Sequence, residues 1–386
     1  MNKSIYLLSG ILLFFYSCSN QTEEVSNRDF SYELEIVDSL MIDFLGNPQL
    51  LSVDSENDHF LFSGAEFNEL LLVNREGEIV SEFKKPMDSP DSYGQFPLGG
   101  SVYKDQIAIT GMNKMNLYDL EFNLKKSIKQ PYSNNFIYML FIGYDHLQPI
   151  EIDGKIKYVA YIIGAQTELN SNDAKYFLEY NTFDFIDTEE ETYEPIIPFH
   201  KRSRYFESQT AYNTIKPTFQ VGDGLIHFAH THDSMYYEYD LKNPENFKAE
   251  KIPFDNFILD KGFALGGEED RENEKDRPGQ ISNLFMHKDQ VMIVYRSGLK
   301  LDQMPEPNED QQERYSQIMK KDKSKLIVRE ENGAYSKPFL LPDAWRISFV
   351  DKKGRIWAHQ NVNALEYEPD MVTLYELKLV KKELED

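Results

Sequence analysis

At 386 residues the chain is long enough to bury a large core, and its 41% hydrophobic and 13% aromatic content excludes a chain that is disordered as a whole. The formal net charge of −24 repels nucleic acid and anionic lipid surfaces, so neither is an expected partner. The 24 Tyr and 26 Phe residues favour strands over helices.

The first 17 residues have the layout of a secretory signal. Lys3 supplies a positive charge, residues 5–16 form an apolar stretch, and Ser17 precedes Cys18. This stretch is shorter than the roughly 20 apolar residues that a membrane-spanning helix needs. We therefore predict that residues 1–17 are a signal peptide, and no later apolar run is long enough to cross a membrane.

Cys18 is the only cysteine, so a disulfide within the chain is impossible. The Phe-Tyr-Ser-Cys sequence that ends at Cys18 resembles a bacterial lipobox, which implies lipid attachment to Cys18. Residues 18–29 are then an acidic tether, in which residues 21–24 (Gln-Thr-Glu-Glu) resemble the tag that routes Bacteroidota lipoproteins to the cell surface. We expect an outer-membrane lipoprotein on the cell surface or on the periplasmic face.

Residues 50–83 contain four short apolar runs, each closed by a polar cluster. This pattern is typical of four consecutive antiparallel strands. The runs are residues 50–53, 60–62, 70–73 and 79–83. Weaker copies of this unit extend over about residues 99–128, 136–199, 218–253, 280–340 and 345–384.

Two of the copies are longer than the others. In the third we predict strands at residues 138–143, 157–163 and 176–181, and we interpret the acidic residues 184–194 as an insertion. The fifth has an insertion at residues 297–324, in which residues 310–320 have a helical composition.

Repeated four-stranded units without intervening helices predict an all-β fold, a six-bladed β-propeller over residues 30–386. Residues 30–44 are strand-like and precede the first unit, so we expect the N-terminus to complete the last blade and close the ring. The alternative is a ring of seven blades that uses residues 204–217 or 254–267 as part of another blade.

The last unit contains a turn for which Gly354 supplies a positive φ, within the pattern Asp351-x-x-Gly354-x-x-Trp357. This pattern resembles the repeat of sensor-type propellers. With the signal, Cys18, the tether and the four-strand repeats, the chain resembles the six-bladed, TolB-like β-propeller lipoproteins of Bacteroidota, a family whose domain has no known function. The resemblance extends from residue 30 to the C-terminus and implies a fold and a cellular address.

In a propeller, the links between blades and the turns between second and third strands share one face, and functional residues gather on such loops. We expect this face to be the binding face. It would collect residues 65–68, 112–114, 165–173, 230–234, 297–324 and 360–363. The polar candidates at corresponding points of different blades are Glu66, Asn113, Arg296 and Asn361.

Histidines in residues 227–232 suggest a metal site, because imidazole is a good ligand for zinc. Side chains alternate along a strand, which predicts that His230 and His232 share a face while His227 points away. His359 occupies the equivalent place in the last blade. The alternative is a polar turn with one strand-facing histidine, and no cofactor is predicted unless these residues hold a divalent cation.

No Gly-x-Ser-x-Gly elbow, phosphate-binding glycine loop or cysteine nucleophile follows the tether, so no enzyme class is indicated. The hypothesis is a lipid-anchored binding module for a glycan, a peptide or an envelope protein. The alternatives are a metal-dependent propeller hydrolase, lactonase or lyase for a small sugar-derived substrate, and a structural member of an envelope complex. Aromatic candidates for sugar contact are Tyr205, Phe206, Tyr212, Tyr236 and Tyr295.

Overall fold

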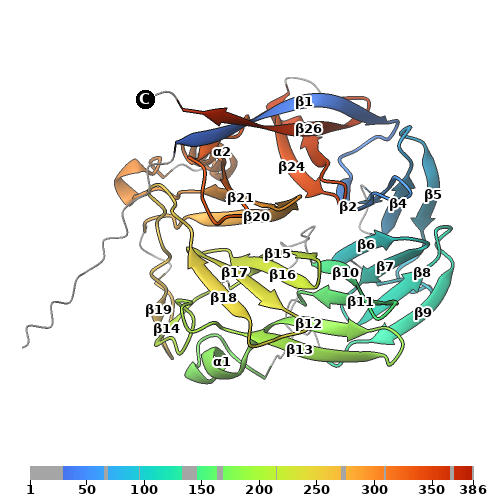
Figure 1. Cartoon of the computed structure of the whole chain (residues 1–386), viewed down its shortest axis with the longest axis horizontal. Helices are drawn as coiled ribbons and strands as arrows, with labels where there is room; N and C mark the ends of the chain where they lie inside the picture. The colour runs from blue at the N-terminus through green and yellow to red at the C-terminus, as the bar shows by residue number, and fades with distance from the viewer. Residues whose placement is uncertain are drawn as a thin grey trace, which may run out of the picture.

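The computed structural model describes residues 29–64, 68–94, 96–132, 146–162, 168–213, 215–270, 275–307, 310–365 and 369–384. These residues form six four-stranded antiparallel sheets around a central axis, with one additional two-stranded sheet (Figure 1). The prediction of a six-bladed β-propeller is therefore confirmed.

Each blade is described here from its inner strand to its outer strand. Blade one is β2 (Gln49–Asp54), β3 (His59–Ser63), β4 (Glu69–Val73) and β5 (Ile79–Lys84), and blade two is β6 (Gly99–Tyr103), β7 (Gln106–Thr110), β8 (Lys114–Tyr118) and β9 (Leu124–Lys129). Blade three is β10 (Leu147–Ile152), β11 (Lys155–Ala160), β12 (Asn181–Asp187) and β13 (Thr192–Pro198), and blade four is β15 (Pro217–Gly222), β16 (Leu225–His230), β17 (Met235–Asp240) and β18 (Phe247–Lys251). Blade five is β20 (Gln280–His287), β21 (Gln290–Arg296), β22 (Lys325–Arg329) and β23 (Phe339–Leu340), and blade six is β24 (Trp345–Val350), β25 (Ile356–Gln360), β26 (Val372–Glu383) and β1 (Phe30–Ile42).

The N-terminal strand closes the ring, as expected. β1 pairs antiparallel with β26 from Phe30 opposite Glu383 to Ile42 opposite Val372. Both ends of the chain thus share one sheet (Figure 1). Opening the ring would require breaking this long ladder, which makes the pairing the main closure of the fold.

Apolar side chains of neighbouring blades pack between the sheets and form the core. Between blades six and one, Trp357 is fully buried and meets the ring of Phe60 edge-on at 4.8 Å. Buried aromatic pairs of this kind add to the stabilisation that comes from the removal of apolar area from water. The inner and middle strands of a blade are covered on both faces by neighbouring blades. Successive side chains on both faces are therefore apolar, and these strands appear in the sequence as short, nearly continuous apolar runs.

Blade three differs from the prediction. Residues 176–181 are not a strand: most of them lie in α1 (Ala174–Glu179), which begins where the Asp173 carboxylate accepts a hydrogen bond from the Lys175 N–H at 2.9 Å. Tyr176, Phe177 and Tyr180 are buried together, a helical spacing of apolar residues that we misread as a strand. The acidic residues 184–194 belong to β12, β13 and their turn and are no insertion, while the predicted strand 138–143 lies outside the described residues.

The two segments proposed for a seventh blade meet in the small sheet of β14 (Thr210–Ala211) and β19 (Phe263–Ala264), which lies outside the ring.

The predictions of a helix in the insertion of blade five and of a positive φ at Gly354 are confirmed. α2 (Gln311–Lys321) occupies the insertion of blade five, beside the 3-10 turn Leu301–Gln303, and a second 3-10 turn, Val362–Ala364, follows β25. Gly354 has a φ of 75° in its turn.

The two faces of the ring carry different connections. The face with the links between blades and the turns from second to third strands is called the loop face, and the opposite face, with the hairpins between first and second strands, is called the hairpin face. Inner strands therefore start at the loop face and end at the hairpin face. No helix among the described residues is long and apolar enough to cross a membrane.

Candidate functional site

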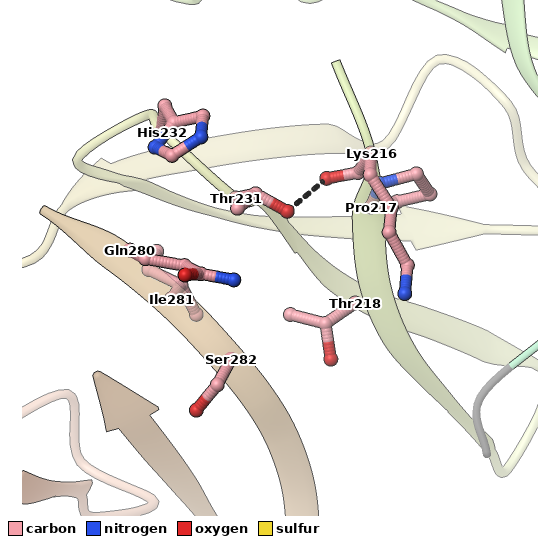
Figure 2. Close-up of a pocket in the computed structure, with 8 residues that line it drawn as sticks. All are labelled: Lys216, Pro217, Thr218, Thr231, His232, Gln280, Ile281 and Ser282. Atoms are coloured by element: carbon pink, nitrogen blue, oxygen red, sulfur yellow. Dashed lines mark hydrogen bonds between the residues drawn. The ribbon is translucent and has the colours of Figure 1, made fainter. Parts of the chain in front are cut away.

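A pocket of about 240 Å³ opens at the loop-face end of blades four and five. We call it the mouth pocket, and Figure 2 shows its lining around the starts of the inner strands β15 and β20. The lining residues are Lys216, Pro217, Thr218, Thr231, His232, Gln280, Ile281 and Ser282. Most of these side chains carry a donor or an acceptor, and none carries a carboxylate.

Backbone hydrogen bonds hold the walls of the mouth pocket together. The Lys216 carbonyl accepts from the Thr231 N–H and from the Thr231 hydroxyl, both at 2.8 Å, and the Thr231 carbonyl accepts from the Ile281 N–H at 2.8 Å. These bonds join the start of β15, the turn after β16 and the start of β20. The pocket is thus preorganised by the scaffold, which reduces the entropy lost when a ligand binds.

Further along the channel, side chains of the protein itself fill the space between the inner strands. Gln220 of β15 reaches two blades away, and its amide nitrogen donates to the Val350 carbonyl of β24 at 3.2 Å. Near the hairpin face, the Lys352 amino group of blade six lies 4.0 Å from the ring centre of Tyr103 in blade two. A ligand in the mouth pocket would therefore approach from the loop face.

Two arginines extend the positive charge of the mouth towards blade six. Arg296, the last residue of β21, pairs directly with Gln280 of the pocket lining. Its Nε is buried without a hydrogen-bond partner among the described residues. Burial lowers the pKa of Arg296, an effect that Tyr315 and Asp322 oppose and that Arg346 reinforces. Arg346 itself is exposed on β24.

The three histidines of residues 227–232 have separate surroundings. His227 points towards blade five, with its Nδ1 2.6 Å from the Tyr236 hydroxyl. His230 ends β16 and packs among aromatic rings, including Phe199 and Tyr205, and burial lowers its pKa to about 3, so that it is neutral. Because the strand ends at His230, the alternation does not continue to His232, whose Nδ1–H donates to the Gly279 carbonyl at 2.7 Å.

The remaining candidates do not gather in one place. His359 pairs with Arg346 near the same end of the channel, and its Nδ1–H donates to the Gln360 carbonyl at 3.0 Å. Asn361 holds the link before blade six, where its amide donates to the Asp343 carbonyl at 2.7 Å. The Asn113 carbonyl accepts from the Gln130 N–H in blade two.

Two predicted residues, Glu66 and Cys18, lie outside the described residues. Within the described part of the chain, no group of three or more His, Cys, Asp or Glu residues is placed to hold a metal ion. Of the aromatic candidates, Phe206 is 41% exposed. The other four are buried core residues, namely Tyr205, Tyr212, Tyr236 and Tyr295.

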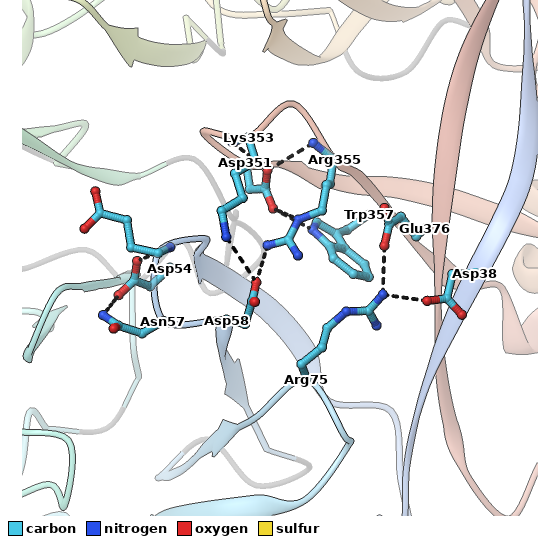
Figure 3. Close-up of polar contacts among 11 residues, drawn as sticks. Asp38, Asp54, Asn57, Asp58, Arg75, Asp351, Lys353, Arg355, Trp357 and Glu376 are labelled. Atoms are coloured by element: carbon cyan, nitrogen blue, oxygen red, sulfur yellow. Dashed lines mark hydrogen bonds and ion pairs between the residues drawn. The ribbon is translucent and has the colours of Figure 1, made fainter.

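A second polar cluster, the closure seam, joins blades six and one (Figure 3). It consists of Asp38, Asp58, Arg75, Asp351, Arg355, Trp357 and Glu376. The Asp351 carboxylate accepts hydrogen bonds from Arg355 Nε at 2.7 Å and Trp357 Nε1 at 3.2 Å. The sequence pattern around Gly354 thus belongs to ring closure and not to the mouth.

The mouth pocket opens on the face that the sequence predicted as the binding face, and of the predicted residues His232 lines it and Arg296 lies beside it. The sequence did not indicate the other lining residues Lys216, Thr218, Gln280 and Ser282. One signal was available: these residues stand at the starts of two predicted inner strands, where short polar side chains border a mouth. Only the pairing of β15 with β16 and of β20 with β21 brings them together.

Two solved structures have a similar fold. One is a member of the DUF4221 family from Bacteroides vulgatus, with a TM-score of 0.62 at 9% identity over 92% of this chain and 100% of that chain. The other is a proposed exported protein from Bacteroides fragilis, with a TM-score of 0.50 at 12% identity over 93% of this chain and 98% of that chain. At these identities the likeness shows the fold alone, and the predicted resemblance to Bacteroidota propellers is confirmed at that level. The sequence matches no protein-family model and no curated protein sequence.

Proposed function

We propose that this chain is a lipid-anchored binding module of the cell envelope that takes a glycan into the mouth pocket. The observation that carries the proposal is the pocket of about 240 Å³ at the loop-face end of the inner strands. Its lining offers the hydroxyls of Thr218 and Ser282 and the amide of Gln280. Sugar hydroxyls donate and accept hydrogen bonds. The Ser282 hydroxyl donates to the Val294 carbonyl at 3.2 Å and can still accept from a ligand, the Thr218 hydroxyl accepts from the Leu284 N–H at 3.0 Å, and the Gln280 amide can donate and accept.

The shape of the site favours a small polar ligand over a protein surface. Ligand pockets are concave and of several hundred Å³, whereas a stable protein interface buries roughly 1,200 Å² or more of flatter surface. The mouth pocket is concave, and the fixed walls around Thr231 suit a ligand of defined shape. A glycan is therefore favoured over a peptide or an envelope protein.

The proposed anchor on Cys18 gives the mouth pocket an orientation. β1 starts at the hairpin face, where the Tyr32 hydroxyl accepts from the amide of Gln290, the first residue of β21, at 2.7 Å. A tether that leads from Cys18 into Phe30 would thus hold the hairpin face towards the membrane. The mouth pocket would then face away from the membrane, towards glycans outside it.

Binding is tested by applying the full chain to a glycan array together with a Ser282→Trp variant. Ser282 is exposed at the pocket, and an indole there should fill the space. We expect the variant to lose about tenfold or more in affinity for the glycans that the native chain binds. Asp289→Trp is the matched control, because it adds the same bulk to the hairpin of the same blade on the other face.

Equal binding by the native chain and Ser282→Trp would exclude the mouth pocket as the glycan site. If the native chain bound to a peptide array and not to the glycan array, the ligand would be a peptide and not a glycan. The anchor is tested separately with Cys18→Ser, which should move the protein from the membrane fraction to the soluble fraction. Membrane retention of that variant would contradict lipid attachment at Cys18.

A further inference from the structure

The mouth of the channel is basic in a strongly acidic protein. The chain has a formal net charge of −24 with 65 acidic residues, yet no Asp or Glu lines the mouth pocket. Lys216 belongs to the lining, and Arg296 lies one strand away, paired with Gln280. A basic mouth is therefore not a consequence of composition.

The two arginines near the mouth differ from many other Lys and Arg side chains of the described residues, which make ion pairs with Asp or Glu. Arg296 Nε is buried without a hydrogen-bond partner among the described residues, and the exposed Arg346 makes no side-chain hydrogen bond or ion pair with them. Asp322 is the carboxylate that raises the pKa of Arg296. It already accepts from the Gly298 N–H at 3.0 Å and lies 3.7 Å from Arg277. A buried donor without an acceptor is unfavourable, and an anion in the neighbouring pocket would offset part of that cost through its charge.

The acceptors and donors of the mouth pocket define the rest of the ligand. Figure 2 shows Lys216 and Thr218 on the side of β15, with Gln280 and Ser282 across from them on β20. A polyol fits between such groups, because each hydroxyl of the ligand can meet a hydroxyl or an amide. Tyr315 of α2 is 56% exposed, and its effect on the pKa of Arg296 opposes that of burial.

We propose that the mouth pocket binds a sugar acid, with the ligand carboxylate held by Lys216 and attracted by Arg296 and Arg346. This inference rests on the proposed glycan-binding function and makes its ligand class specific. Charge-assisted hydrogen bonds between an ammonium and a carboxylate are about twice as strong as those between neutral groups. The repulsion from a net charge of −24 makes such a local counter-ion necessary for any anionic ligand.

The test compares glucuronate with glucose, which differ at one carbon, by titration calorimetry on the full chain. We expect glucuronate to bind about tenfold tighter or more, with an affinity that falls as salt is added. Lys216→Met keeps most of the apolar stem and removes the charge, so it should lower the affinity for glucuronate by about tenfold and bring the ratio of the glucuronate and glucose affinities close to one. Lys352→Met is the matched control, since it removes the same charge at the hairpin end of the channel.

Four results would overturn the inference. Equal affinity for glucuronate and glucose would leave the glycan site in place without a role for charge. Inorganic phosphate that competes as well as glucuronate would indicate a plain anion site. An equal loss in Lys352→Met would indicate a general field effect rather than a contact with Lys216. Absence of glucuronate binding also counts against it, and the glycan array with Ser282→Trp then shows whether the broader function fails as well.

Discussion

In the closure seam, Arg75 and Arg355 each contact two carboxylates, whereas at the loop-face end of blade six Arg346 is exposed and contacts none among the described residues. Arg355 and Arg346 both belong to blade six, so membership of that blade does not explain the difference. The seam joins the first and last blades, and its charged side chains form ion pairs that hold these blades together. Near the mouth, Arg346 makes no ion pair with the described residues, and an unpaired positive charge favours a nearby anion.

The largest expected effect is the loss of the central carboxylate of the seam. Asp351 is 3% exposed and accepts hydrogen bonds from Arg355 and Trp357, so Asp351→Ala leaves the Arg355 Nε and the indole N–H without their acceptor, while Arg355 keeps its ion pair with Asp58. We expect the free energy of unfolding to fall by about 3 to 5 kcal/mol. Urea unfolding monitored by Trp fluorescence measures this change.

Asp240→Ala is the control for that prediction. Asp240 also organises a turn, accepting from the Lys242 N–H at 2.8 Å and the Asn243 amide at 2.9 Å, but water can replace it there. It should destabilise clearly less than Asp351→Ala. Equal losses in the two variants would mean that the seam contributes no more than an ordinary turn.

The next prediction concerns Asp184, a buried carboxylate whose hydrogen-bond partner is a neutral hydroxyl. It lies 1% exposed in β12, its side-chain partner among the described residues is the Tyr132 hydroxyl at 2.6 Å, and burial raises its pKa from 3.8 to about 6. Between these two values the folded state binds more protons than the unfolded state, so the free energy of unfolding falls as pH rises. Above pH 6 the penalty amounts to about 3 kcal/mol, and Asp184→Asn should be more stable than the native chain by up to that amount at pH 8 and similar to it at pH 4.

Asp187 on the same strand is the matched control, with the opposite sign. Its hydrogen bond with Lys157 lowers its pKa to about 2, so the stability that it contributes is present at neutral pH and is lost as pH falls through that value. Asp187→Asn should therefore be less stable than the native chain at pH 7. A pH profile that is unchanged in Asp184→Asn would contradict the burial argument for Asp184.

Much of the fold could be predicted because its signals are local. The runs at residues 50–53, 60–62, 70–73 and 79–83 coincide with β2 to β5. β2, β3 and β4 are buried on both faces, whereas the outer strand β5 buries mainly Phe83, and polar residues separate the four runs. α1 was missed because Tyr176, Phe177 and Tyr180 pack on residues of the next interblade link, including Phe199, Tyr205 and Tyr212. The 6 residues of α1 are too few to distinguish their helical spacing from a short strand, and contacts with distant segments cannot be predicted from the local pattern.

The candidate site was predictable as a face but not as a set of residues. His230 and His232 are two positions apart, yet the end of β16 sends the first into an aromatic cluster and leaves the second at the mouth pocket. Lys216 and Gln280 are 64 positions apart and line one pocket because β15 and β20 start side by side. Neither outcome depends on residue type, so composition and spacing could not reveal it.

The smallest expected effect is the sharpest test of the comparison, because it makes one substitution in both regions. Arg75→Leu removes two ion pairs and the contact of the guanidinium with the Trp357 ring at 5.0 Å, which should lower the free energy of unfolding by about 1 to 2 kcal/mol. Arg346→Leu removes a charge that the described residues do not pair, so its stability should stay within about 0.5 kcal/mol of the native chain. Glucuronate binding should respond in the reverse way, weakened by Arg346→Leu and unchanged by Arg75→Leu. If Arg346→Leu destabilised the chain as much as Arg75→Leu did, the mouth would be part of the closure of the ring, and its charges would have a structural role instead of a ligand.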